Sequence, residues 1–127
     1  MTDIRSFRGK VKSRVGAVVR LTALDIFNRV TKKTPVDTGR ARAGWNLAIG
    51  HADLSVPPEG QENYPAPTPK LGRIEAGDTV VLSDNVPYIG ELENGHSKQA
   101  PAGMVRLSIE ETKTAMGGIV REVSRGA

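Results

Sequence analysis

Apolar residues near the start of the chain recur at the spacing of an amphipathic helix. They lie mostly three, four or seven residues apart, at Ile4, Phe7, Val11, Val15, Val18, Val19, Ile26, Phe27 and Val30. The opposite face is basic and carries Arg5, Arg8, Lys10, Lys12, Arg14, Arg20 and Arg29. Thr2 can cap this helix, Lys32 and Lys33 suit the negative end of its dipole, and Pro35 stops it. We predict a helix of about 28 residues here.

The pattern changes after Pro35. The residues Asp37-Thr38-Gly39-Arg40 are typical of a turn that leads into a short helical segment ending near Ala43. Residues 45–49 then alternate as a strand does. Five of the eight prolines fall between Ser55 and Pro69, which excludes a regular element there. We expect a loop over about residues 52–72 that projects from the sheet.

The second half of the chain predicts short strands and then another long helix. Ile74 is expected to open a short strand, and residues 78–83 a clearer one. Residues 87–93 suit one or two helical turns, with Pro87 near the start. A helix from about Gly103 to Ser124 is predicted by the spacing of Val105, Ile109, Thr112, Met116, Ile119, Val120 and Val123.

This order of elements favours a single α+β domain over residues 1–127. It contains no βαβ alternation and no internal repeat. We expect the long N-terminal and C-terminal helices to pack on a small, mainly antiparallel sheet that carries the long Pro-rich loop.

Composition narrows the possible functions. The 127 residues contain no cysteine, which excludes disulfide frameworks, thiol catalysis and Cys-ligated zinc. Hydrophobic residues make up 38% and aromatic residues 4%, so we expect a thin aliphatic core that neighbouring subunits stabilise. No apolar run approaches the roughly 18 residues of a membrane span, and we expect no signal peptide.

Charge is distributed unevenly along the chain. Residues 1–45 carry eleven Lys and Arg against three Asp, whereas residues 46–127 carry seven basic against eleven acidic residues. The two parts should therefore attract each other. Such polarity suits contact between unlike faces of successive subunits, or a basic face turned towards phosphate.

Two segments carry a resemblance to a known family. One is Thr34-Pro35-Val36-Asp37-Thr38-Gly39-Arg40-Ala41-Arg42-Ala43-Gly44-Trp45; the other runs from Tyr88-Ile89-Gly90-Glu91-Leu92-Glu93-Asn94-Gly95-His96-Ser97 to Ala100-Pro101-Ala102-Gly103-Met104-Val105. In order and spacing they resemble the tail-component, or tail-completion, family of long-tailed bacteriophages. In that family a long first helix precedes the first segment, and a C-terminal helix follows the second.

The resemblance implies a structural protein of the virion neck, made in the host cytoplasm, with no catalytic role and no cofactor. Such a protein forms a ring, which we expect to be hexameric, that completes the tail and joins it to the head connector. Phage DNA would pass through the lumen. Its partners would be other copies, head-connector or stopper proteins, and tail-tube or tail-terminator proteins. Terminator, stopper and completion factor all remain open as its role.

Several residues of the two segments are candidates for a subunit or partner interface. They are Asp37, Thr38, Arg40, Tyr88, Glu91, Glu93, His96, Pro101 and Met104. The alternative is that they shape the fold: Asp37 can accept amide hydrogens within its own turn, and Trp45 supplies a large buried ring. Glu91 and Glu93 are candidate partners for the basic helix of a neighbour, which would make ring closure sensitive to salt.

Other functions are weighed against this one. A non-specific nucleic-acid-binding module could use Arg5, Arg8 and Lys12 on the basic helix, but no interleaved aromatics or base-reading motif are present. Asp37-Thr38-Gly39 matches an aspartic-protease triplet, yet Arg40 beside it would favour ionised carboxylates over a shared proton. His51 and His96 lack paired ligands at metal-binding spacing, so we expect no metal site. Gly117-Gly118 lies in a helical pattern and does not form a phosphate-binding loop.

Overall fold

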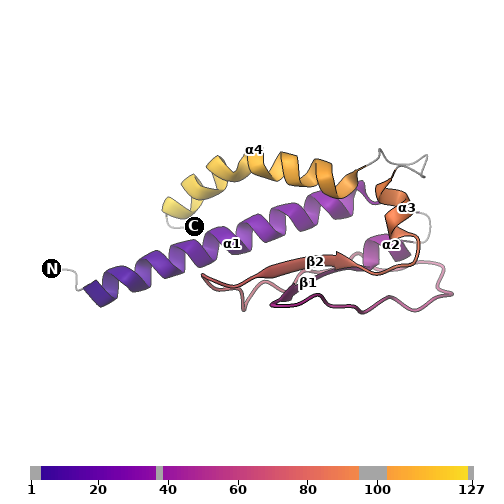
Figure 1. Ribbon diagram of the computed structural model, residues 1–127, viewed down its shortest axis with the longest axis horizontal. Coiled ribbons are helices and arrows are strands. Elements are labelled where there is room, and N and C mark those ends of the chain that lie inside the picture. Colours follow the sequence, from indigo (N-terminus) through magenta and orange to yellow (C-terminus); the bar gives the residue numbers. More distant parts are fainter. Residues whose placement is uncertain (1–3, 37–38, 95–102, 126–127) are drawn as a thin grey trace.

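The computed structural model describes residues 4–36, 39–94 and 103–125, and it has the expected α+β fold (Figure 1). In chain order the elements are α1 (Ile4–Lys33), α2 (Arg40–Ala43), β1 (Trp45–Ile49), β2 (Val80–Asp84), α3 (Ile89–Glu93) and α4 (Met104–Ser124). The two long helices begin and end within a few residues of the predicted positions. The cap predicted at Thr2 and the Asp37-Thr38 part of the predicted turn lie outside the described residues.

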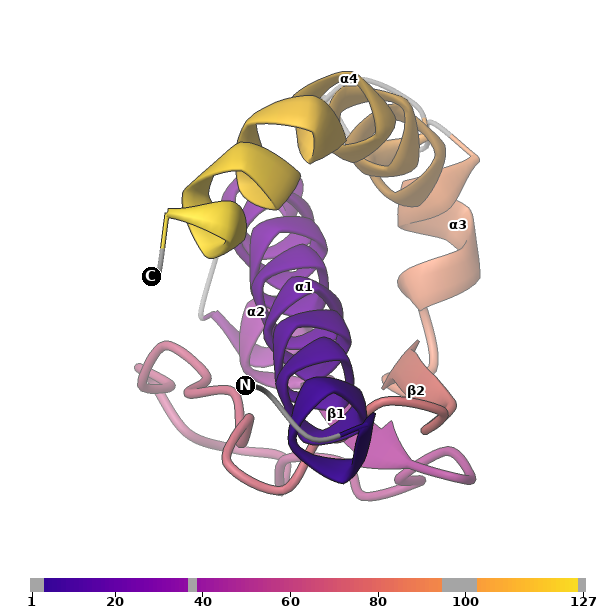
Figure 2. The ribbon, with the colours of Figure 1, turned by 90° about the vertical axis from the view of Figure 1, so that its left-hand side faces the viewer.

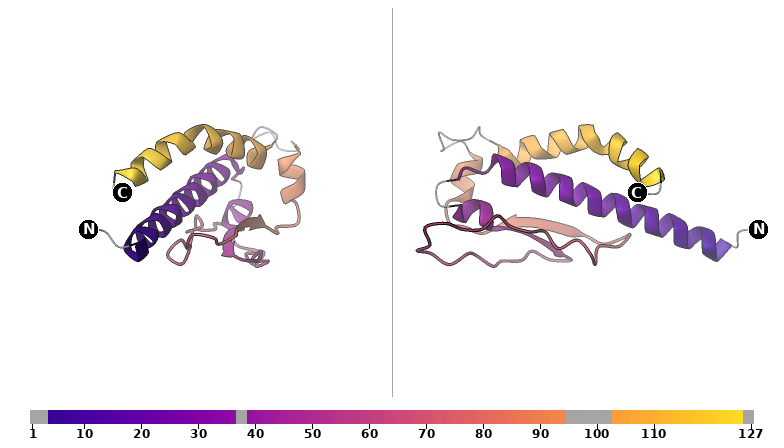
Figure 3. Two further views of the ribbon diagram at one scale, coloured as in Figure 1. Left: turned by 60° about the vertical axis from the view of Figure 1, so that its left-hand side comes forward. Right: turned by 180° about the vertical axis from the view of Figure 1, so that it is seen from behind.

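The elements form three layers. Helix α4 packs on one side of α1. The antiparallel pair of strands β1 and β2, which we call the hairpin although a long segment joins them, lies on another side of α1 together with that segment (Figures 1 and 2). The sequence suggested that both long helices pack on the sheet, but α4 packs mainly on α1. Helix α1 has 30 residues and α4 has 21, which correspond to about 45 Å and about 32 Å of helix. The N-terminal end of α1 therefore extends past both neighbouring layers (Figure 3).

The hairpin register places its apolar residues towards α1. Strands β1 and β2 are antiparallel, with Leu47 opposite Leu82 and Trp45 opposite Asp84. Alternate residues of a strand share a face, so Trp45 and Leu47 lie on the same side. Both pack with the core, in which Phe27, Val30 and the side chain of Met104 are almost fully buried.

A hydrogen-bonded chain fixes the corner where α1 ends. The indole Nε1 of Trp45 donates to Thr34 Oγ1 at 2.8 Å, and the same hydroxyl donates to the carbonyl of Val30 at 2.7 Å. The sulfur of Met104 lies 3.6 Å from this hydroxyl oxygen. The end of α1, the start of β1 and the start of α4 therefore meet at one buried polar group.

The strand predicted at Ile74 is absent. Its amide donates to the carbonyl of Leu71 at 3.2 Å, which closes a turn, and its own carbonyl accepts a hydrogen bond from Arg20 at 2.7 Å. The Ile74 side chain is 1% exposed. Burial of a single side chain, and not pairing with another strand, thus explains its apolar character. The next strand begins at Val80, two residues later than predicted.

The Pro-rich segment contains no helix or strand, as expected, but it is tied to the domain at several points. Asn46 Nδ2 donates to the carbonyl of Ser55 at 3.1 Å, and Ser83 Oγ donates to the carbonyl of Asp53 at 3.0 Å. Tyr64 is buried, and its hydroxyl donates to the carbonyl of Pro58. The segment runs back and forth on the hairpin side of α1 (Figure 1).

Candidate subunit interface

The N-terminal end of α1 is an exposed helix with both apolar and basic side chains. Residues 8–15 are all exposed, because α4 and the hairpin stop short of them. Val11 and Val15 are each 44% exposed. Four basic residues there make no ion pair or hydrogen bond with any other described residue: Arg8, Lys10, Lys12 and Arg14. We call residues 4–15 the projecting end.

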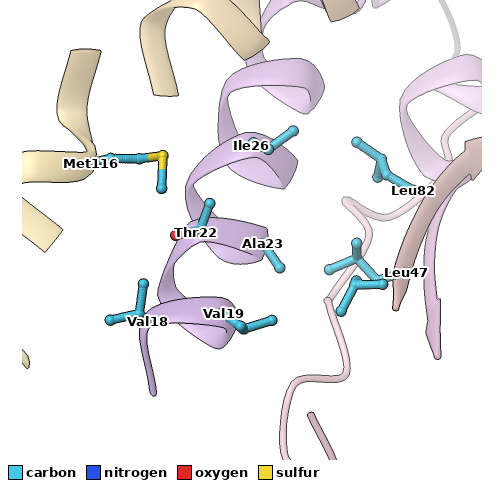
Figure 4. A pocket seen from close by; sticks show the side chains of 9 residues that line it. Val18, Val19, Thr22, Ala23, Ile26, Leu47, Leu82 and Met116 are labelled. Atoms are coloured by element: carbon cyan, nitrogen blue, oxygen red, sulfur yellow. The ribbon is translucent and has the colours of Figure 1, made fainter. Parts of the chain in front are cut away.

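The residues predicted to face phosphate lie together on this projecting end. Arg5, Arg8 and Lys12 are spaced by three and four residues, so they share one face of the helix. All three are exposed. Four residues further on from Val15, Val19 continues roughly the same side of α1, where it is half-buried and lies near Leu47 of the hairpin (Figure 4). The projecting end is thus the exposed continuation of a face that is partly buried further along.

An apolar trough runs beside the projecting end. Its floor is α1, one wall is α4 and the other is the hairpin (Figure 4). Its volume is about 310 Å³. Nine residues line it: Val18, Val19, Thr22, Ala23, Ile26, Leu47, Val80, Leu82 and Met116. The Thr22 hydroxyl is the only polar side-chain group among them, so the trough suits an aliphatic occupant.

Exposed apolar side chains extend the trough along α4. Ile109, Met116 and Val120 are spaced by seven and four residues and therefore share a face. They are 38%, 39% and 46% exposed. Single exposed apolar residues are ordinary, but a continuous group beside an apolar trough is typical of an interaction surface.

Polar contacts hold α4 in place as one wall of the trough. Asp25 accepts hydrogen bonds from Arg29 at 2.8 Å and from Thr112 at 2.7 Å. Glu111 on α4 pairs with Lys33 and lies 3.8 Å from Arg29. Partial burial acts to raise the pKa of Asp25, but these two hydrogen bonds and the nearby cations outweigh it and hold that pKa below its usual value.

Two of the predicted interface residues serve the fold instead. The carboxylate of Glu93 accepts the backbone N–H of Val105 at 2.9 Å and that of Arg106 at 3.4 Å, so it satisfies free amides in the first turn of α4. Met104 is 1% exposed and belongs to the core. We therefore assign both side chains to the corner between α3 and α4, because neither is free for a partner in this conformation.

The other predicted interface residues have varied positions. Tyr88 is 38% exposed beside α3. Arg40 Nε donates to the carbonyl of Pro57 at 3.1 Å, so it helps to hold the Pro-rich segment. Glu91 lies in α3, but its side chain is outside the described part of the chain. Asp37, Thr38, His96 and Pro101 lie outside the described residues.

The turn before α2 requires glycine at position 39. Gly39 has a φ of 91°, in the left-handed region. A Cβ atom there would lie 3.3 Å from the carbonyl oxygen of Tyr64. This part of the first family-like segment therefore supports the anchor of the Pro-rich segment, which agrees with a role in shaping the fold.

Asp84 at the end of β2 is an unusual buried carboxylate. Burial raises its pKa to about 6, although a hydrogen bond from the Val86 amide at 3.0 Å and the charge of Arg40 act in the opposite direction. Its Oδ2 atom has no hydrogen-bond partner among the described residues. Asp84 faces the α2–β1 junction, where a Cβ atom on Gly44 would come within 2.6 Å of Oδ1.

No family model matches this chain. No curated protein and no solved structure matches it either. Among the described residues no group of three His, Asp or Glu side chains is placed to hold a metal ion, and no helix is both long enough and apolar enough to cross a bilayer. His51 is exposed.

The trough was missed by the sequence analysis because three separate elements form it. In the sequence, Val18 and Val19 belong to the apolar spacing of the first helix, Leu47 and Leu82 belong to the two strands, and Met116 belongs to the apolar spacing of the last helix. One signal was available: the apolar stripe of α1 begins at Ile4, far ahead of any element that could cover it.

Proposed function

We propose that this protein is a structural subunit of the neck of a long-tailed phage. Copies of it form a homo-oligomeric ring, which we take to be hexameric, that completes the tail and receives the head connector. Its position is the virion, after assembly in the host cytoplasm. The two sequence segments that resemble the tail-completion family support the neck role, and the surfaces of the subunit support the ring.

One structural observation carries the proposal: the subunit has two unlike exposed surfaces that are complementary. The projecting end of α1 is basic and partly apolar, whereas the trough is apolar and one of its walls belongs to an acidic layer. Residues 46–94, which include most of the hairpin and its connecting segment, hold eight acidic and two basic residues. Contact between unlike surfaces is heterologous, and heterologous contacts close into rings when the rotation permits.

The family-like segments support this arrangement by their positions. The first runs from Thr34 to Trp45, whose side chains are hydrogen-bonded to each other at the end of α1. In the second, the Gly103 amide donates to the carbonyl of Glu93 at 2.7 Å, which joins α3 to α4. Both segments therefore set the angle between the layers, on which the shape of the trough depends.

The test combines assembly in solution with function in the phage. The full chain is purified, its mass is measured by native mass spectrometry, and its symmetry is determined by electron microscopy. A phage that lacks the gene should accumulate heads and tails that do not join, and the wild-type gene supplied in trans should restore infectivity. Infective particles formed without this protein would refute the proposal.

A second function is favoured by four unpaired cations of the projecting end, Arg8, Lys10, Lys12 and Arg14. They could contact DNA phosphates, either inside the ring or as a separate binding activity. Fluorescence anisotropy with unrelated duplexes across a salt series tests this. Phosphate contact gives a steep, sequence-independent salt dependence that Arg8→Gln/Lys12→Gln reduces and Lys70→Gln/Arg73→Gln does not. Absence of binding at low salt would exclude it.

A further inference from the structure

We propose that the trough of each subunit is filled by the projecting end of α1 from a neighbouring copy. This inference rests on the proposed ring and specifies its contact. The occupant is a second copy of this chain, and residues 4–15 are the part that enters. Each subunit would thus donate one helix end and accept another.

The apolar chemistry of the two surfaces agrees with this contact. The projecting end presents Val11 and Val15, which are each 44% exposed. The trough has aliphatic side chains on its floor and both walls, and its volume of about 310 Å³ is roughly twice that of the 150 Å³ apolar cavity that holds one benzene in another protein. It can therefore accept more than one aliphatic side chain. Burial of these two valines in the trough would favour association, because it removes apolar surface from water.

Charge complementarity between the projecting end and the hairpin wall favours this occupant. Five basic residues and no acidic residue lie between Arg5 and Arg14. The hairpin wall belongs to the acidic layer of residues 46–94, in which Glu75 and Asp78 shortly precede the trough residue Val80. A basic helix end beside this wall is attracted to it.

The same charges disfavour the symmetric alternative. Two copies could pair their α1 stripes directly, Val15 against Val15, in a two-fold dimer. That arrangement brings two basic segments together without acidic side chains between them, and such like-charge contacts are costly. The heterologous contact avoids this repulsion. It also leaves a free donor surface at one end of an unfinished oligomer and a free acceptor surface at the other, as growth into a ring requires.

Cysteine cross-linking tests the contact, because the chain has no cysteine of its own. Val11→Cys protein and Met116→Cys protein carry different mass tags and are mixed, and a short bis-maleimide reagent is added. We expect mixed-tag dimers that join the two positions. Both side chains are at least 39% exposed, so neither substitution should prevent folding. Leu54→Cys serves as the matched control, because Leu54 is 70% exposed and lies outside the trough.

The outcomes separate this inference from the proposed function. Mixed Val11–Met116 products well above the Leu54 control support the inference. Cross-links of Val11 to itself, or a ring in which Val11 and Met116 do not react, overturn it and leave the ring standing. Cross-linking in a chain that assembles only into open filaments, and never enters particles, supports the contact but refutes the neck role. A chain that stays monomeric at all concentrations overturns the inference.

A second variant measures the contribution of the apolar contact. Val11→Asp places a carboxylate on the projecting end, outside the folded core, so the circular dichroism spectrum and urea midpoint of the monomer should not change. Its assembly constant should fall by about tenfold or more, since a carboxylate would be buried among aliphatic side chains. Assembly as strong as that of the wild type, or filling of the trough by a small apolar ligand without any effect on assembly, would contradict the proposal.

Discussion

Thr34 is the residue at which the ends of α1, β1 and α4 are joined. Its hydroxyl accepts from the Trp45 indole and donates to the Val30 carbonyl, and it is 3% exposed. When a buried donor loses its acceptor, the free-energy cost of removing that donor from water is no longer offset by a hydrogen bond. The Thr34 hydroxyl therefore contributes to the stability of this corner although it is a small group.

Replacement of Thr34 by valine keeps the shape and removes the hydroxyl. We expect Thr34→Val to lower the free energy of unfolding by about 1–3 kcal/mol, because the Trp45 N–H is left buried without a partner. Urea unfolding followed by the fluorescence of Trp45, the sole tryptophan, measures this. Thr31→Val is the matched control, since the Thr31 hydroxyl bonds only to the exposed Asn28 carbonyl at 3.0 Å. Equal losses in the two variants would show that the Trp45 hydrogen bond is unimportant.

Because of the raised pKa of Asp84, we expect its contribution to the free energy of unfolding to decrease as the pH rises. Its pKa of about 6 in the folded chain lies above the usual value of about 3.9, so the folded state binds more protons between these values. Its contribution to stability is therefore fully present below about pH 4 and is lost as the pH rises through about 6.

The Asp84→Asn variant should remove this dependence while it keeps an oxygen for the Val86 amide. Between pH 4 and pH 7 the stability of the wild type should fall relative to that of the variant. We expect a change on the order of 1–2 kcal/mol, below the full shift because the carboxylate is partly solvated. Urea midpoints at matched pH values measure it. Parallel pH profiles for the two proteins would mean that Asp84 is ionised normally.

Among the elements, α4 depends on a cap that comes from another helix. Its N-cap residue, Gly103, has a φ of 80° and no side chain with which to cap the helix. Glu93 at the end of α3 supplies the acceptor instead, and its negative charge also suits the positive end of the α4 dipole. This contact joins α3 to the first turn of α4.

Loss of this cap should destabilise α4 locally. We expect Glu93→Ala to cost about 0.5–2 kcal/mol and to reduce hydrogen-exchange protection in the first turns of α4. Glu110→Ala is the control, because Glu110 is exposed on α4 and pairs only with Lys113 at 3.5 Å. If the Glu93 and Glu110 variants are equally stable as monomers and only the first fails to assemble, Glu93 contacts a partner, as its sequence context had suggested.

Across the whole molecule, opposite charges are held in different layers. Four basic residues of the projecting end, Arg8, Lys10, Lys12 and Arg14, make no ion pair or hydrogen bond within the described part of their own subunit. The layer of the hairpin and its connecting segment is acidic, because it holds six of the 14 acidic residues and only two basic ones. Assembly by contact of these layers would be weakened by salt, because exposed charges are screened within about 8–10 Å at physiological ionic strength.

Charge reversal on the projecting end should weaken assembly. Arg8→Glu/Lys12→Glu changes the net charge from +4 to zero, and Lys70→Glu/Arg73→Glu makes the same change in the acidic layer. We expect only the first pair to reduce the oligomer fraction measured by analytical ultracentrifugation, and added salt to reduce that of the wild type. Equal behaviour of the two pairs would indicate that net charge, and not the projecting end, controls assembly.

The sequence by itself determined the elements and their class. The periodic apolar residues of α1 and α4 predicted both long helices, and Pro35 marked the end of the first. Alternation at residues 45–49 predicted β1, and the concentration of prolines predicted the segment without regular structure. These features are local, because hydrogen bonding and side-chain direction within an element follow from neighbouring residues.

Only the tertiary structure decided which apolar residues are covered and where the trough lies. Isoleucine is common in strand cores, but Ile74 is buried in a turn. Glu93 caps a helix that begins eleven residues later. Val11 and Val18 belong to one stripe, yet only Val18 lies between α4 and the hairpin. Coverage depends on where distant elements end in space, which no local pattern contains.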